Sequence, residues 1–441
     1  MREWQVLFTA RSFMEGKGVI VSPSLRSGKF LSIILGFVMI LGGLSACAQN
    51  SNTNGTTTTS QGPITIGVSL PLSGDFSQDG AATKNGYILW QDYINSHGGL
   101  LGRQVQFDIL NNGSSVTQTG TDYTTLIGTH HDNLVVGPFA DDYTVAAARS
   151  AARFGYPMVN GSGEAPTVFT QQPPLTNVFS VSLPAANTLN SLALYILSLP
   201  ASIRPTTAAY ATEDDPYLHP IVTEARAKLE AGNITTLTSP AEIVYPPETT
   251  DWTPIADKII ATHAQIVILG TVTPDAVAFV NRFKQEHYNP KVLVEVSGPD
   301  QGTQFTDPIG GTKVAQGIFV PNGGWYPGIK TFGEQEFEQA YTAQFKVTPD
   351  NINQDSVQAW SVMQVMQQAI QNNNSIDNTK LMNELRTGTF QTIQGPVKFQ
   401  SDGQNALAVP FLYQWQSGSL IPVYPANNAQ SSPIFPKPVW P

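Results

Sequence analysis

The sequence contains one cysteine, Cys47, and few charged residues, which make up 13% of its 441 residues. A single cysteine cannot form an internal disulfide, so the fold does not depend on a disulfide framework. Acidic residues outnumber basic ones by 33 to 23, and no cluster of Lys and Arg is present that could neutralise a phosphate backbone. We therefore do not expect nucleic acid as a partner.

The common enzyme signatures are also missing. The sequence has no G-x-S-x-G, H-E-x-x-H, Walker A or G-x-G-x-x-G motif, which mark nucleophilic, metal-dependent and nucleotide-dependent sites. His130 and His131 lack a Cys or a third His nearby, so we expect a solvated loop there, and we predict neither a metal nor a cofactor. Paired carboxylates could still serve a glycosidase, whose two carboxyl groups lie about 5 to 10 Å apart.

A calcium loop is the first candidate site that the sequence offers. Four residues, Asp75, Ser77, Asp79 and Gly80, fall at the first, third, fifth and sixth positions of the EF-hand pattern. The twelfth position must supply a bidentate Glu, but it is Gly86. We therefore do not expect calcium binding.

The N-terminal region is typical of an export signal. Arg26 and Lys29 precede an apolar stretch at 30–44, which is short for a membrane span of about 20 residues. We predict a signal peptide over residues 1–46 and an extracytoplasmic location for the mature protein.

The sequence LSAC at residues 44–47 resembles the bacterial lipoprotein box, in which the cysteine is lipidated and becomes the new N-terminus. This resemblance implies lipidation of Cys47. Residues 47–62 are uncharged and of low complexity, as a flexible tether requires. We therefore expect the lipid to be the only contact with the membrane.

Predicted strands and helices alternate from Pro63 onwards. Short apolar runs predict strands at 64–70, 105–110, 133–139, 157–159, 207–211, 242–245, 266–270 and 292–296. Strands that alternate with helices predict an α/β fold with parallel, doubly wound sheets, here in two lobes. Later segments at 317–321, 355–371, 396–399 and 409–415 do not begin a third series, so we expect them to return to these lobes.

Candidate site residues follow from the position of the loops. In open parallel sheets, ligands bind beyond the carboxyl ends of the strands. This rule selects the loops at 71–80, 137–144, 160–166, 212–218, 270–275 and 297–303. The side chains of interest are Asp79, Asp141, Asp142, Tyr143, Ser162, Glu164, Tyr217 and Asp300. For each carboxylate, a helix cap or a solvated loop charge is the alternative, and Asp79 is expected either to cap the next helix or to face the site.

The order of several motifs carries a family resemblance. These are LSG after the first strand, NSHGG at 95–99, VVGP at 135–138, YPMVNGSGEAP at 156–166, GPVKFQSDGQN at 395–405 and FLYQWQSGSLIPVYP at 411–425. Together they resemble the branched-chain amino acid-binding family of ABC-transporter substrate-binding proteins, over nearly all of residues 63–425. The resemblance implies a type I periplasmic-binding fold, with two lobes joined by three crossovers that close on a small solute. Its lobes would comprise 63–184 with 320–394, and 185–319 with 395–441.

The resemblance also implies a division of roles at the site. In amino acid-binding members, small hydroxyl side chains and backbone N–H groups of the first lobe hold the ligand carboxylate, and an acidic residue of the second lobe holds the ammonium. Asp300 matches that acidic residue, and Tyr217 matches an aromatic residue that covers the ligand.

Asp141 and Glu164 depart from this pattern, because they stand where small hydroxyl residues are expected. Either their side chains turn away, so that Ser162, Thr144 and backbone N–H groups bind a carboxylate, or the ligand is not a simple α-amino acid. Tyr143 lies in the same loop as Asp141.

We therefore expect a monomeric, lipid-anchored solute-binding protein without enzymatic activity. It would capture a small polar solute, either an amino acid or a related amine or amide, and deliver it to an ABC transporter permease with its ATPase subunits. A ligand-sensing receptor module of the same fold is the first alternative, and a hydrolase with paired carboxylates is the second.

Overall fold

The computed structural model describes residues 62–441. The predicted signal peptide, Cys47 and all of the predicted tether except Gly62 lie outside the described residues. Among residues 62–441, none of the helices combines the length and the apolar character that crossing a membrane requires.

The first sheet is parallel and begins with the N-terminal strand of the described chain. Its strands have the order β2-β1-β3. They comprise β1 (Ile64–Leu70), β2 (Val105–Asn111) and β3 (Leu134–Val135). A bridge between Val136 and Val159 links this sheet to the parallel pair β4 (Met158–Asn160) and β5 (Val178–Ser180). The side chains of β1 are almost completely buried, as expected for a parallel strand covered on both faces.

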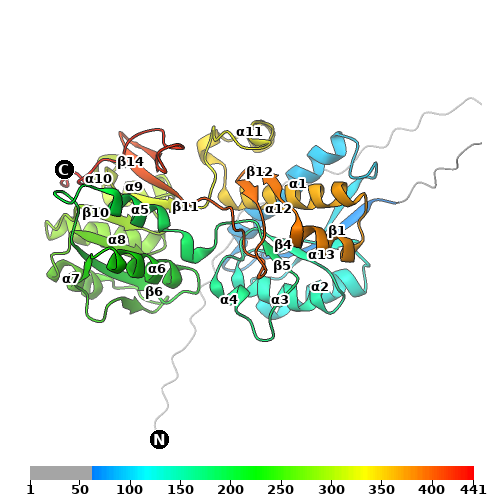
Figure 1. Ribbon diagram of the computed structural model, residues 1–441, viewed down its shortest axis with the longest axis horizontal. Coiled ribbons are helices and arrows are strands. Elements are labelled where there is room, and N and C mark those ends of the chain that lie inside the picture. The colour runs from blue at the N-terminus through cyan, green and yellow to red at the C-terminus, as the bar shows by residue number, and fades with distance from the viewer. Residues whose placement is uncertain (1–61) are drawn as a thin grey trace, which may run out of the picture. The chain divides into compact units, whose positions relative to one another are not determined.

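Helices from distant parts of the sequence cover the first sheet. They are α1 (Ser77–Ser96), α2 (Val116–Gly128), α3 (Asp141–Ala152), α12 (Gln354–Asn373) and α13 (Asn378–Thr387). Helix α12, which includes the predicted segment 355–371, packs against α1 (Figure 1). This approach is close, because a Cβ atom at Gly86 would lie 2.3 Å from the backbone oxygen of Ser356. The residues that resemble a calcium loop, from Ser77 onwards, therefore belong to a packed helix.

The second sheet has eight strands in the order β15-β14-β11-β10-β9-β6-β7, with β8 also paired to β6. The parallel strands are β6 (Thr207–Glu213), β7 (Thr235–Thr236), β8 (Ile243–Tyr245), β9 (Ile266–Gly270), β10 (Val292–Glu295) and β11 (Phe319–Asn322). The strands β14 (Phe411–Gln416) and β15 (Ser419–Tyr424) extend it in antiparallel fashion. Ile266 and Ile268 face one buried core, and Val267 and Leu269 face another, so β9 is apolar along its whole length.

The helices of the second sheet lie between its strands in sequence, except the first, which precedes β6. They are α5 (Asn190–Ser198), α6 (Leu218–Ala231), α7 (Thr253–Ala261), α8 (Thr273–Gln285), α9 (Thr303–Ile309) and α10 (Thr312–Ala315). The alternating pattern confirms the predicted doubly wound α/β class. Asp251 accepts a hydrogen bond from the backbone N–H of Thr253, and it thereby supports the start of α7.

The remaining elements are short or connect the sheets. They are α4 (Pro166–Phe169), α11 (Glu334–Phe345), the 3-10 turns Ala185–Asn187 and Pro349–Asn351, and the hairpin of β12 (Phe390–Thr392) and β13 (Gly395–Val397). The chain passes from the first sheet to the second after β5, returns after β11, and enters the second sheet again at β14. One predicted strand, 133–139, is reduced to β3, because Gly137 and Pro138 follow it in the turn toward α3.

Candidate functional site

Four of the predicted side chains meet at the loops that follow the strands. Tyr217 lies partly buried just before α6, and burial raises its pKa well above the usual value, with the charges of Glu164, Asp141 and Asp300 as further causes. Electrostatic effects of this kind require proximity. We call Asp141, Glu164, Tyr217 and Asp300 the acidic site. Asp141, at the start of α3, and Glu164 follow β3 and β4, whereas Tyr217 and Asp300 follow β6 and β10 of the second sheet.

Asp141 is the first residue of α3, and its carboxylate joins two loops of the first sheet. The Oδ1 atom accepts hydrogen bonds from the backbone N–H groups of Glu164 at 2.7 Å and Ala165 at 2.8 Å. Burial raises the pKa of Asp141 to about 6, although these two hydrogen bonds oppose the shift. A protein carboxylate thus occupies backbone donors of the loop that the family resemblance assigns to the carboxylate of a ligand.

Glu164 has a different environment. Its side chain is buried, and Oε1 accepts a hydrogen bond of 2.7 Å from Nε2 of Gln358 on α12. Burial, followed by the charge of Asp141, raises the pKa of Glu164 well above its usual value. Both carboxyl groups therefore bind a proton more tightly than they would in water.

The hydroxyl groups predicted to bind a ligand carboxylate already have protein partners. The hydroxyl of Thr144 is buried and donates to the backbone oxygen of Ala140 at 2.8 Å. The Ser162 hydroxyl accepts from the Ala140 N–H at 3.1 Å and donates to the Pro138 oxygen at 3.3 Å. Tyr143 is buried, and its ring packs edge-on to that of Phe76. Roles for these residues in ligand binding stay predictions.

The residues contributed by the second sheet are more accessible. Asp300 is exposed, and its Oδ1 accepts a hydrogen bond of 2.9 Å from the backbone N–H of Gly298. Nevertheless, desolvation by the surrounding protein raises the pKa of Asp300. Solvent thus reaches this carboxylate even though the surrounding protein removes part of its hydration. Asp300 is therefore the carboxylate of the acidic site that an incoming solute can reach most easily.

Two more acids lie near the acidic site, and sequence reasoning found one of them. Asp79 lies in the first turn of α1, two residues after the helix begins, and the N-cap position is occupied by Phe76. Asp79 is therefore not the N-cap residue, and its alternative role at the site stays a prediction. Asp355, in the first turn of α12, has a pKa raised to about 7 by burial and then by the charge of Asp79, and its own charge acts on Glu164.

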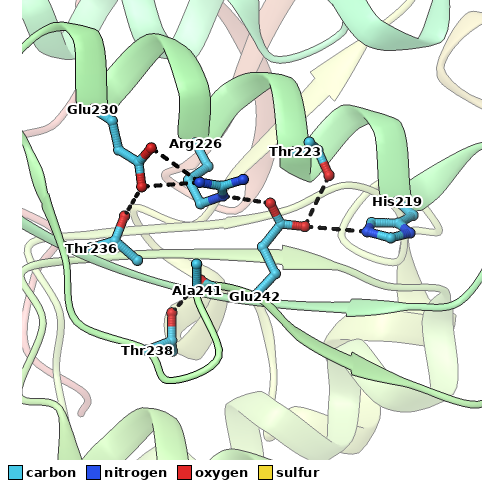
Figure 2. Close-up of polar contacts among 8 residues, drawn as sticks. All are labelled: His219, Thr223, Arg226, Glu230, Thr236, Thr238, Ala241 and Glu242. Carbon is cyan, nitrogen blue, oxygen red and sulfur yellow. Dashed lines mark hydrogen bonds and ion pairs between the residues drawn. The ribbon is translucent and has the colours of Figure 1, made fainter.

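The polar network around Glu242 fixes the helix that follows Tyr217. Glu242 Oε1 pairs with Nε of Arg226 at 2.6 Å, and Oε2 accepts from the hydroxyl of Thr223 at 2.9 Å (Figure 2). Nε2 of His219, which is also on α6, lies 3.4 Å from Oε2 of Glu242. Because Glu242 is almost completely buried, these contacts hold α6 against the segment before β8. The network involves α6, which begins directly after Tyr217, but none of its residues belongs to the acidic site.

Two surface hollows among residues 62–441 do not contain the residues of the acidic site. The larger has a volume of about 720 Å³ and lies along α2 and α3, with Asp142 and Arg149 in its lining. The smaller, of about 300 Å³, is lined by residues that include Pro166, His219 and Glu224. We place the candidate site at the strand ends, because chemistry and topology coincide there.

Comparison with known proteins identifies the family. Residues 63–419 match the model of the periplasmic binding protein family, so the chain belongs to that family. The match confirms the resemblance to branched-chain amino acid-type ABC transporter substrate-binding proteins, and it identifies the chain as a solute-binding protein rather than an enzyme.

Curated relatives align with this chain along nearly their whole length. Leu/Ile/Val-binding protein homolog 8 of Brucella abortus is 22% identical over 387 residues, which cover 85% of this chain and 93% of the relative. Leu/Ile/Val-binding protein homolog 7 of Brucella melitensis is 21% identical over 393 residues, which cover 85% of this chain and 94% of the relative.

Solved structures show the same fold. The substrate-binding protein LivJ of Streptococcus pneumoniae, in complex with isoleucine, matches with a TM-score of 0.66 and 17% identity, covering 81% of this chain and 97% of that one. A solute-binding protein from R. palustris, in complex with benzoate, matches with a TM-score of 0.65 and 17% identity, covering 82% and 95%. A putative branched-chain amino acid transporter protein from Silicibacter pomeroyi reaches a TM-score of 0.73 at 17% identity, covering 85% and 99%. The type I periplasmic-binding fold is therefore confirmed.

Proposed function

We propose that this protein captures a small, amine-bearing solute at the acidic site and delivers it to an ABC transporter permease. The observation that carries the proposal is the position of Asp141, whose carboxylate accepts the N–H groups of Glu164 and Ala165. A solute that needed these donors for its own carboxylate would have to displace Asp141. A solute with a positive charge meets no such obstacle.

The charge of the acidic site supports the same conclusion. The neighbours that raise the pKa values of Asp141, Glu164 and Tyr217 by their charge are all carboxylates. Two like charges about 4 Å apart repel by about 4 kcal/mol at an effective dielectric constant of about 20. An amine would instead be attracted, above all by the accessible carboxylate of Asp300. The ligands named in related structures, isoleucine and benzoate, both carry a carboxylate, so this protein would differ from those relatives in its ligand.

The remaining parts of the proposal concern transport. The lobes, 63–184 with 320–394 and 185–319 with 395–441, would close on the solute, with Tyr217 covering it. Lipidation of Cys47 would keep the protein at the outer face of the membrane, close to the permease. Mass spectrometry of the N-terminal peptide of protein purified from membranes tests the anchor. A mature N-terminus at Cys47 that carries a lipid is expected, and an unmodified chain would contradict it.

A thermal-shift screen of the purified protein tests the ligand class. The panel contains primary amines, diamines, amides, α-amino acids and benzoate. A ligand at about 100 times its Kd should add about 2.7 kcal/mol of stability and raise the melting temperature clearly. We expect stabilisation by amines. Stabilisation by α-amino acids or benzoate, without any effect of amines, would contradict the proposed ligand class.

A further inference from the structure

A second cluster of charged side chains lies on the first sheet, and none of its members belongs to the acidic site. Asp108 of β2 meets His130 and Asp132, which follow α2, and one potential ligand atom of each lies within 4.8 Å of the others. We call these residues the Asp-His-Asp cluster. His130 has no Cys or third His near it in the sequence, but the fold brings two carboxylates to it.

Strand register explains how the two carboxylates meet. Gly67 of β1 pairs with Asp108 of β2, so the two residues lie side by side on the sheet. A Cβ atom at Gly67 would lie only 2.6 Å from Oδ2 of Asp132. The carboxylate of Asp132 therefore fills the space that a side chain at position 67 would occupy, directly beside Asp108.

The carboxylate of Asp132 is not fully satisfied by the protein. Asp132 is 2% exposed, and its Oδ2 atom has no hydrogen-bond partner among the described residues. A buried carboxylate oxygen without a partner is costly, because it loses its hydration without compensation. Such a group calls for a cation beside it.

The other two members leave a route for an ion. The side chains of His130 and Asp108 are 38% and 32% exposed, so solvent reaches the cluster from outside. His130 Nδ1 lies 2.6 Å from Asp108 Oδ2, which is the distance of a hydrogen bond. Two ligands of a tetrahedral ion, each about 2.0 to 2.1 Å from it, would lie about 3.3 Å apart. A small shift of the exposed imidazole would therefore exchange this hydrogen bond for a shared metal ion.

We propose that the Asp-His-Asp cluster binds one divalent transition-metal ion of the Zn²⁺ type. One imidazole nitrogen and two carboxylate oxygens form a ligand set that Zn²⁺ accepts, with water at the fourth position. Ca²⁺ and Mg²⁺ fit less well, because they require six or more oxygen ligands. The ion would neutralise the two carboxylates and tie the segment after α2 to the edge strand β2. This site is independent of the proposed solute.

Isothermal titration calorimetry of the tag-free, chelator-treated full chain with Zn²⁺ in the presence of excess Mg²⁺ tests the proposal. We expect one Zn²⁺ per chain, and at least a tenfold loss of affinity in Asp132→Asn and in His130→Ala. The neighbouring variant His131→Ala serves as the matched control and should bind Zn²⁺ as the original protein does. No binding, or equal losses in His130→Ala and His131→Ala, would overturn the proposal.

Folding must be separated from metal binding in these variants. Without metal, Asp132→Asn should melt no lower than the original protein, because the change removes a buried charge. Addition of Zn²⁺ should then raise the melting temperature of the original protein and not that of the variant. If Asp132→Asn fails to fold, Asp108→Asn at the partly exposed edge strand provides the same test. Equal stabilisation of variant and original by Zn²⁺ would contradict the assignment.

Discussion

The two halves of the acidic site use the same chemical group in different ways. In the first half, Asp141 is held by two backbone N–H groups and Glu164 by Gln358. In the second half, Asp300 accepts one hydrogen bond from its own loop and is exposed. The difference shows that a carboxylate at a site can be part of the scaffold or available to a ligand, depending on the donors around it. We therefore expect changes in the first half to act on stability, and changes in the second to act on binding.

The largest effect is expected for Asp141→Ala. This change leaves the buried N–H groups of Glu164 and Ala165 without an acceptor, at a cost of about 1 to 3 kcal/mol each. We expect the free energy of unfolding, measured by urea denaturation, to fall by about 3 kcal/mol. Asp141→Asn keeps an oxygen at the same position and should lose far less. Equal losses of unfolding free energy in Asp141→Ala and Asp141→Asn would show that the two hydrogen bonds do not cause the destabilisation. Asp142→Ala, a change at the exposed neighbouring residue, serves as the control.

The next effect concerns binding through the second half. Asp300→Ala should weaken the binding of an amine by about 1.5 to 3 kcal/mol, or about 10- to 150-fold, because a charged hydrogen bond is lost. Calorimetric titration gives the change in affinity, and urea denaturation should show nearly unchanged stability. The exposed residue Asp307 provides a matched control as Asp307→Ala. Unchanged amine affinity in Asp300→Ala would rule out the assigned site.

The pH dependence of stability should reveal the buried acids. Burial raises the pKa of Asp141 to about 6 and that of Asp355 to about 7, so both groups bind protons more tightly in the folded state. The free energy of unfolding should therefore rise as the pH falls from about 7 toward 4, by about 2 to 3 kcal/mol for each of the two groups.

Urea denaturation at several pH values measures this dependence, and Asp355→Asn should make it weaker. Amine affinity should change in the opposite direction, because protonation removes the negative charges that attract the ligand. If the free energy of unfolding falls steadily below pH 7 in both the original protein and Asp355→Asn, the expected pKa shifts are contradicted.

The smallest effect distinguishes the scaffold role of Ser162 from a role in binding. Its hydroxyl joins Ala140 and Pro138, so Ser162→Ala should reduce the free energy of unfolding by about 1 kcal/mol and leave amine affinity unchanged. Paired denaturation and titration measurements check both values. A tenfold loss of affinity without a change in stability would instead make Ser162 a ligand contact.

Sequence patterns predicted the fold better than the contacts of the site. Strands such as β1 and β9 are continuous apolar runs, because both faces of a parallel sheet are covered, and their positions are confirmed. Strand β7 has two residues and lies at an edge, so it carries too little pattern to be predicted. The antiparallel hairpin of β14 and β15 joins the second sheet through β11, and this pairing depends on packing between distant segments.

The site illustrates the same limit. Topology placed Asp141 and Glu164 near the strand ends, because loops at these positions recur in parallel sheets. The residues that contact or influence Glu164 were not predictable, because Gln358 and Asp355 belong to α12, which is far away in the sequence. An acid in the first turn of a helix is common for reasons of helix stability alone, so Asp355 gave no distinct signal. The Asp-His-Asp cluster was not predictable for a similar reason, because the fold brings Asp108 of β2 to His130 and Asp132, which follow α2.

The most direct test of the central claim compares an α-amino acid with the amine that lacks only its carboxylate. Isoleucine and 2-methylbutylamine form such a pair, and calorimetric titration of the original protein measures both affinities under the same conditions. If the first half of the acidic site is scaffold and the second half binds ammonium, the amine binds more tightly than the amino acid. Tight binding of isoleucine together with no binding of the amine would contradict the account.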